Sequence, residues 1–360
     1  MLKAGYIITL LSGIGIFNSC TANFFNMQDY EKQYAYMQKQ ETVYGNYLAG
    51  RIAHIRQDYD NAAYYYVKSL EKGMVNKDLL GKTYIILASQ GQIDKAVKYA
   101  QIARKNGDDN TFIDVIDAVN NFKHGKYKEA RDKMVKIEEK TYQNLISPLF
   151  SAWSYVGEGN YNQAVAELNR LSETEDLKTV YYLHKGLIAE YFKKNEEAQK
   201  SYDVVINDRS GDISFRALQI ITNFLIRSQN KSKAESLVAK YYGSSNIKEM
   251  LSSLSKKIKE SDSSIPLLVD SANKGIGEVF LEIALLFKTI PAGYDYAQMY
   301  MAISEYFNPD NDITKIAMAD IFEERQMYKD ANKYYDSVSK KSEMFYPAQI
   351  KKANNLSEEK

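Results

Sequence analysis

The stretch GRIAHIRQDYDNAAYYYVKSL, residues 50–70, contains the pattern that decides the fold. Two small residues, Gly50 and Ala62, stand twelve positions apart in it. Tyr59 and Tyr66 lie three positions before and four positions after the alanine. Offsets of −3, 0 and +4 fall on one face of an α-helix. The stretch therefore predicts two helices joined by a short turn, with small residues where the helices meet.

The alanine of this stretch recurs along the chain. Five such alanines follow one another at intervals of 34 residues, and the later intervals are 36, 63 and 34 residues. One helix pair cannot bury its apolar stripe alone, whereas stacked pairs can. We therefore predict that these alanine anchors are wedged between packed helices. They are Ala62, Ala96, Ala130, Ala164, Ala198, Ala234, Ala297 and Ala331.

The residues around the anchors give two further local predictions. Gly91, Gly125 and Gly159 lie five positions before their anchors, where a residue that tolerates left-handed dihedrals ends the preceding helix. In the run of three tyrosines at 64–66, each residue turns 100° around the helix from the one before. We expect Tyr66 in the core, Tyr65 at its edge and Tyr64 in solvent.

This pattern resembles the tetratricopeptide repeat, and so does GLIAEYFKKNEEAQKSYDVVI at residues 186–206. The resemblance covers residues 44–242 and 276–340. It implies an all-α, right-handed superhelical solenoid of antiparallel helix pairs. The chain as a whole resembles secreted or lipid-anchored repeat proteins of alphaproteobacteria.

The repeat pattern divides the chain into five segments. We predict a signal peptide over residues 1–20, a linker or helix over 21–43, and an array of about six repeats over 44–242. A degenerate helix and linker over 243–266 precede C-terminal repeats over 267–360. The last of these ends in an amphipathic helix, which either caps the array or marks a chain that stops before its natural end.

The first twenty residues, MLKAGYIITLLSGIGIFNSC, have the order of an export signal. Lys3 precedes an apolar run, Ala4–Phe17, that is shorter than the ~20 residues a membrane span needs. The segment resembles a bacterial lipoprotein signal, which would make Cys20 the lipidated residue. The alternatives are cleavage after Ala22 and a segment that is never cleaved. We expect a periplasmic protein, or a lipoprotein anchored at the outer membrane.

Residues that carry chemistry are sparse. One cysteine in the chain excludes an internal disulfide and a zinc site built on cysteine pairs. His54, His124 and His184 fall on different faces of separate units, so we predict no metal site and no cofactor. The carboxylates fall at helix surface positions, so we predict no enzyme. A formal net charge of +1, spread along the chain, argues against a nucleic-acid partner.

The resemblance also implies a concave groove lined by the first helix of each unit. In the geometry of the family, residues about 15, 11 and 8 positions before each anchor face that groove. The candidate partner-binding residues are Tyr47, Arg51, His54, Trp153, Leu187, Glu190, Gln219, Asn223 and Arg227.

These features predict a non-catalytic scaffold of the bacterial cell envelope that binds a protein partner or peptide in its groove, for envelope assembly or secretion. The alternative is a module that binds a cell-wall or exported polysaccharide. Exposed tyrosine and tryptophan side chains clustered in one groove would favour the sugar, because their rings stack on sugar rings. A groove of mixed charge and leucine would favour a peptide. Two carboxylates within proton-sharing distance in a cleft would indicate an enzyme.

Overall fold

The computed structural model describes residues 42–137, 143–174, 177–208, 213–242, 247–289 and 293–358. These residues form α-helices joined by turns, with one short 3₁₀ helix, Asn169–Leu171, and no strand among them. The predicted all-α class is confirmed. The predicted signal peptide, Cys20 and the segment up to residue 41 lie outside the described residues.

The first part of the chain consists of six consecutive helix pairs. They are α2 (Val43–Ile55) with α3 (Tyr59–Glu71), α4 (Lys77–Ser89) with α5 (Ile93–Lys105), α6 (Thr111–Lys123) with α7 (Tyr127–Ile137), α8 (Gln143–Gly157) with α9 (Tyr161–Leu168), α10 (Lys178–Tyr191) with α11 (Asn195–Ile206), and α12 (Phe215–Arg227) with α13 (Lys231–Ala239). Within each pair the two helices pack on each other.

The second part begins with a single helix and ends with one. It comprises α14 (Lys248–Glu260), the pair α15 (Ala272–Lys288) and α16 (Tyr294–Phe307), the pair α17 (Asp312–Glu324) and α18 (Tyr328–Asp336), and α19 (Phe345–Glu358). The final helix packs on α18 and touches α14.

The alanine anchors lie where the helices of a pair meet. All eight have 0% of their area exposed. In two units the small residue twelve positions earlier is a glycine that faces a tyrosine ring. A Cβ on Gly50 would lie closer than 3.0 Å to Tyr66, and one on Gly186 would do the same to Tyr202. Glycine is therefore needed here to make room for an aromatic ring.

Seven of the eight anchors have a residue with positive φ five positions before them; for Ala297 that position lies outside the described residues. Gly91, Gly125 and Gly159 have φ of 69°, 74° and 74°, as their position five residues before the anchors predicts. At the same position the other units place non-glycine residues in the same left-handed conformation: Gln57, Lys193, Gln229 and Gln326. The turn geometry is thus kept even where the glycine is lost.

The three consecutive tyrosines are distributed as helix geometry requires. Tyr66 is buried in the core, Tyr65 is half-buried, and Tyr64 is 49% exposed. The triplet therefore reflects packing and does not form one continuous aromatic surface.

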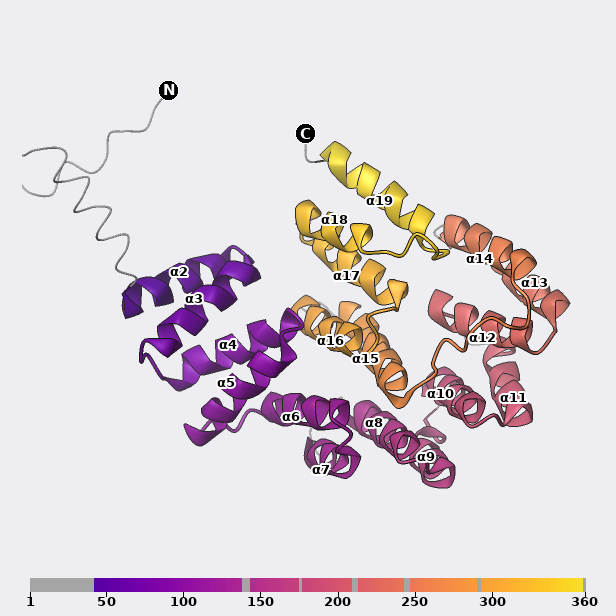
Figure 1. The fold of residues 1–360 in the computed structure, drawn as a ribbon, viewed down its shortest axis with the longest axis horizontal. Helices are drawn as coiled ribbons and strands as arrows, with labels where there is room; N and C mark the ends of the chain where they lie inside the picture. Colours follow the sequence, from indigo (N-terminus) through magenta and orange to yellow (C-terminus); the bar gives the residue numbers. More distant parts are fainter. Residues whose placement is uncertain are drawn as a thin grey trace, which may run out of the picture.

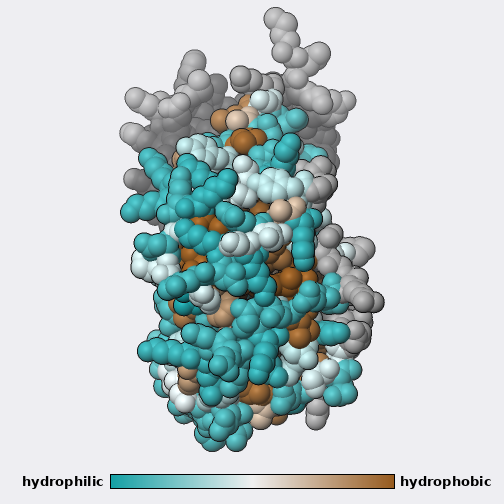
Figure 2. Space-filling model, turned by 90° about the vertical axis from the view of Figure 1, so that its right-hand side faces the viewer, coloured by the Kyte–Doolittle hydropathy of each residue, from teal (hydrophilic) through white to brown (hydrophobic). Residues whose placement is uncertain are grey.

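The six pairs and α14 form an arc, and the rest of the chain turns back inside it (Figure 1). The pair α15 and α16 lies within the arc, where α15 packs on α8 and α16 packs on α4. The pair α17 and α18 extends from there between the two ends of the arc. The outer edge over α11, α13 and α14 is mostly hydrophilic, with hydrophobic residues only in scattered places (Figure 2).

The pair α15 and α16, called the inner pair below, shares a hydrophobic core with the arc. Four buried phenylalanines join α6, α8, α15 and α16: Phe122, Phe150, Phe280 and Phe307. Their ring centroids are 5.2 Å apart for Phe122 and Phe150 and 5.6 Å apart for Phe122 and Phe307. Near the start of α15, a Cβ on Gly275 would lie closer than 3.0 Å to the ring of Trp153 in α8.

This arrangement differs from the open groove that the resemblance implies. The chain's own helices cover the concave face of the arc, and first helices such as α12 bury their inner side against them. Residues 216–226 of α12 are all buried. A helix buried on every side needs neighbours on both faces.

The contact between Gly275 and Trp153 leads to a first prediction. Gly275→Ala forces a methyl group into the indole ring, and we expect it to destabilise the chain by about 1–3 kcal/mol. The matched control is Gly81→Ala in α4, where the nearest atom to the new Cβ is 3.9 Å away. That change replaces glycine inside a helix, and we expect it to stabilise the chain by up to about 1 kcal/mol. Urea denaturation followed by circular dichroism measures both; equal effects would contradict the packing described here.

Candidate functional site

Trp153, the candidate residue of α8, is fully buried beneath α15. Its indole Nε1–H donates a hydrogen bond of 2.9 Å to Nδ1 of His184. Because an indole can only donate, Nδ1 accepts and the ring proton of a neutral His184 lies on Nε2. That nitrogen is 3.0 Å from a carboxylate oxygen of Glu282 in α15. The three side chains link α8 and α10 of the arc to the inner pair.

The candidate residues of α10 and α12 are also engaged within the chain. Leu187 is buried, and the buried Glu190 accepts a 2.8 Å hydrogen bond from the Tyr202 hydroxyl and pairs with Arg227.

Two more candidates of α12 hold the returning chain. The side-chain amide of Gln219 donates to Glu343, just before α19. The Asn223 amide donates a 3.2 Å hydrogen bond to the carbonyl of Pro266. The polar residues on the inner face of α12 thus bind the chain's own segments.

The candidates on α2 are more accessible. Arg51 is exposed, with its guanidinium 6.0 Å from the centre of the half-buried Tyr47 ring. His54 Nδ1 lies 3.3 Å from the Tyr66 hydroxyl. Partner binding by the nine candidates stays a prediction. Five of them are buried against the chain itself: Trp153, Leu187, Glu190, Gln219 and Asn223.

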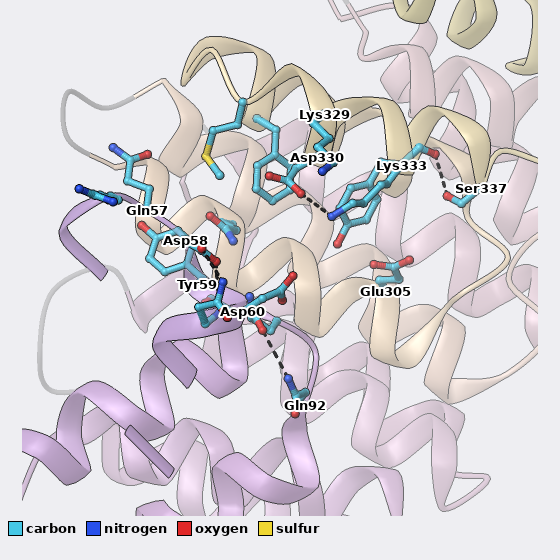
Figure 3. A pocket seen from close by; sticks show the side chains of 18 residues that line it. Gln57, Asp58, Tyr59, Asp60, Gln92, Glu305, Lys329, Asp330, Lys333 and Ser337 are labelled. Carbon is cyan, nitrogen blue, oxygen red and sulfur yellow. Dashed lines mark hydrogen bonds and ion pairs between the residues drawn. The ribbon is translucent and has the colours of Figure 1, made fainter. Parts of the chain in front are cut away.

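A cleft of about 760 Å³ opens where the first pair of the arc faces the C-terminal pairs (Figure 3). Asp58, Tyr59 and Asp60, at the start of α3, lie across it from Asp330 and Lys333 of α18. The lining comes from the start of α3, the turn between α4 and α5, and α16 to α18. It consists of Arg56, Gln57, Asp58, Tyr59, Asp60, Asn61, Ser89, Gln90, Gln92, Gln298, Glu305, Phe322, Met327, Lys329, Asp330, Lys333, Tyr334 and Ser337.

A polar clasp joins the two sides of this cleft. The Tyr59 hydroxyl donates to Asp295 of α16 over 3.1 Å, and Arg325 donates to the same two groups over 3.2 Å and 2.7 Å. Arg325 also donates to Gln298 over 3.0 Å. Residues more than 230 positions apart in the sequence are thereby held together, and the clasp fixes the width of the cleft at one edge.

A single carboxylate lies in the wall of the cleft formed by α16. Glu305 is half-buried, and among the described residues it has no hydrogen-bond or ion-pair partner within 4.0 Å. Burial raises the pKa of its carboxyl, and the charge of Lys315 offsets this only in part. The Lys315 ammonium is itself 2.8 Å from Asp312.

Glu305 shares the lining of the cleft with an aromatic pair and an ion pair. The rings of Phe322 and Tyr334 stack with their centroids 5.6 Å apart. Burial raises the pKa of the Tyr334 hydroxyl, and the nearby carboxylate of Glu305 adds to this effect. Lys333 is 2.7 Å from Asp330, and this hydrogen bond raises the pKa of the lysine.

None of the residues that line the cleft is among the sequence-predicted site residues. They come from the turns of the first two helix pairs, from α16 and from the last pair, α17 and α18, and these parts meet only because the arc closes. Their only common signal in the sequence is an abundance of amides in those turns, at Gln57, Asn61, Gln90 and Gln92.

The described part of the chain lacks both a cluster of metal ligands and a helix that could cross a membrane. No three of its His, Cys, Asp and Glu side chains gather where they could hold a metal ion. No helix there combines the length and the apolar character required to cross a membrane.

No family model and no curated protein matches the chain in sequence. Solved structures match at low identity. A tetratricopeptide repeat protein from Parabacteroides merdae is 12% identical over 78% of this chain and 98% of its own, with a TM-score of 0.45. The APC/C hetero-tetramer Cut9-Hcn1 is 12% identical over 92% and 59%, with a TM-score of 0.35. Yeast Tom70 is 14% identical over 88% and 96%, with a TM-score of 0.22. The likeness of this fold to the tetratricopeptide repeat is seen in the chain's own helix pairs and in its buried alanine anchors.

The environment of Glu305 leads to a second prediction, on pH dependence. Its folded-state pKa lies above the ordinary value of 4.5, so the folded chain binds more protons than the unfolded chain just above that pH. Stability due to this group therefore falls as the pH rises from 4.5 through the folded pKa. We expect Glu305→Gln to be more stable than the wild type at pH 7, with a gain that disappears towards pH 4. Thermal unfolding across this range, with exposed Glu324→Gln as the control, measures the difference; a gain that persists at pH 4 would contradict it.

Proposed function

We propose that the chain is a non-catalytic scaffold that binds a protein partner, and that a segment of this partner lies in the cleft between α3 and α18. One observation carries the proposal: the inner face of the arc is filled by α15 and α16, whereas this cleft is hollow. A partner of the arc would have to displace a phenylalanine core, whereas a partner of the cleft displaces only water.

The lining of the cleft suits a polypeptide. Five amide side chains, which both donate and accept hydrogen bonds, can pair with a peptide backbone: Gln57, Asn61, Gln90, Gln92 and Gln298. Charged groups of both signs stand beside them. Polar rims of this kind surround many protein interfaces.

The polysaccharide alternative receives less support. Trp153 is buried, and the exposed tyrosines of the described chain lie outside the cleft on several different elements. They are Tyr44, Tyr64, Tyr242, Tyr296 and Tyr346. A surface on which sugar rings stack needs such side chains to lie together.

The proposed setting is the bacterial envelope, because the first twenty residues have the order of an export signal. We propose that the scaffold serves envelope assembly or secretion, and that a lipid on Cys20 is its only attachment to the membrane. No nucleic-acid partner is proposed, since the formal net charge is only +1.

The location of the binding surface gives a third prediction. A photo-cross-linking amino acid placed at Asn61 or Ser337, on opposite sides of the cleft, is expected to form a covalent adduct with a polypeptide in intact cells. The control position is Lys136, which is exposed on α7 and lies outside the cleft. Mass spectrometry identifies the adducts. Adducts at Lys136 alone, or none at the cleft positions, would place the partner elsewhere.

The export signal gives a fourth prediction. Protein purified from the native envelope is expected to begin at Cys20 and to carry the added mass of its acyl chains. Intact-mass analysis of the N-terminal peptide measures this. A mature species that begins at an unmodified Asn23 would instead show cleavage after Ala22 and remove the lipid anchor.

A further inference from the structure

The cleft contains one half-buried charge, that of Glu305, for which the described residues supply no ion-pair partner. Of the cations near the cleft, Lys333 is 2.7 Å from Asp330, and Lys315 is 2.8 Å from Asp312. Arg56 and Lys329 are exposed at the rim. The charge of Lys315 lowers the pKa of Glu305 but does not offset the larger effect of burial. A half-buried carboxylate without a partner is unfavourable, and a cation brought by a ligand would relieve this.

An apolar wall adjoins this carboxylate. Phe322 and Tyr334 stack on each other and both line the cleft, together with Met327. Lysine and arginine side chains place their methylene stems on apolar surfaces and their charged ends in polar positions. The guanidinium of arginine also packs against aromatic rings. The wall and the carboxylate together match a long basic side chain.

The charged residues of the whole lining also favour a cation. Its lining has four carboxylates, at Asp58, Asp60, Glu305 and Asp330, against three cations. Asp60 is exposed at the start of α3, and its charge acts on both Lys333 and Tyr334 of α18. A basic segment that entered between α3 and α18 would therefore meet the carboxylates of Asp58 and Asp60 at the start of α3 and that of Glu305 in α16.

We propose that the cleft recognises a polypeptide segment through an arginine or lysine side chain, whose cationic group pairs with Glu305 while its stem packs on Phe322 and Tyr334. This inference rests on the proposed function and adds the chemistry of the partner to it. The amide side chains of the rim then bind the backbone on either side of the basic residue.

The experiment uses a displayed library of random twelve-residue peptides, selected on the full mature chain. Fluorescent copies of the selected peptides are titrated by anisotropy against wild type, Glu305→Gln and Glu324→Gln. In matched peptides each arginine is replaced by citrulline, which removes the charge and keeps the length, or each lysine by acetyl-lysine, which removes the charge. Free arginine and spermidine serve as competitors. Asn61→Trp, which obstructs the cleft, shows whether the peptides bind there.

The proposal expects selected peptides to contain arginine or lysine and to lose affinity for Asn61→Trp. Loss of the cation should weaken binding to wild type and to Glu324→Gln about tenfold, as for other close charge pairs at interfaces. For the Glu305→Gln variant, loss of the cation from the peptide should weaken binding less than twofold, which corresponds to about 0.4 kcal/mol. Thermal unfolding of each variant confirms that it is folded.

The contrary outcomes separate the two proposals. If no peptide is selected, or if Asn61→Trp binds as wild type does, then the cleft is not a peptide site and the proposed function fails. If peptides bind in the cleft but replacing arginine by citrulline weakens binding equally for wild type and Glu305→Gln, then only the proposed pairing of a cation with Glu305 fails. Competition by free arginine or spermidine at the concentration of the peptide would identify a small cation, and not a polypeptide, as the ligand.

Discussion

The structure depends on a small residue at the point where the two helices of each pair meet. Where two helices meet, one residue is alanine or glycine, and an aromatic or aliphatic side chain of the partner helix fills the space above it. Gly50 beneath Tyr66 and Gly186 beneath Tyr202 show the limiting case, in which even a methyl group has no room. Small residues allow axes to approach to about 8 Å. Repeated along the chain, this contact produces pairs of similar shape, and similar pairs stack into an arc.

The helices α15 and α16 return into the arc, so its concave face becomes part of the hydrophobic core. The phenylalanines of four helices pack together, and the buried pair of Arg216 and Glu278, with 2.9 Å between Nε and Oε2, fixes how α12 meets α15. A buried ion pair contributes little net stability, but a misplaced one is costly, so it favours one alignment of the two segments. The closed arrangement fills the concave face and leaves open the cleft beside the clasp of Tyr59, Asp295 and Arg325.

The local parts of this structure could be predicted from sequence, and the long-range parts could not. The buried anchors, the left-handed turn residues and the orientation of Tyr64, Tyr65 and Tyr66 follow from helix geometry within 34 residues. The fate of Trp153 does not, because its neighbour Gly275 lies 122 positions later and belongs to another array. The residues of the cleft were missed for the same reason. Glu305 is one of many carboxylates on a helix, and nothing near it in the sequence indicates that it will line a cleft with Asp60 and Tyr334.

The link between Trp153, His184 and Glu282 has a practical consequence. The chain has a single tryptophan, and it lies at the seam between the arc and the inner pair, with its indole N–H bonded to a histidine. Indole fluorescence shifts to longer wavelength when water reaches the ring. The emission of the native protein therefore reports on one event, the departure of α15 from α8, without any added label. Opening of the seam can thus be followed in real time, separately from the loss of helical structure that circular dichroism detects.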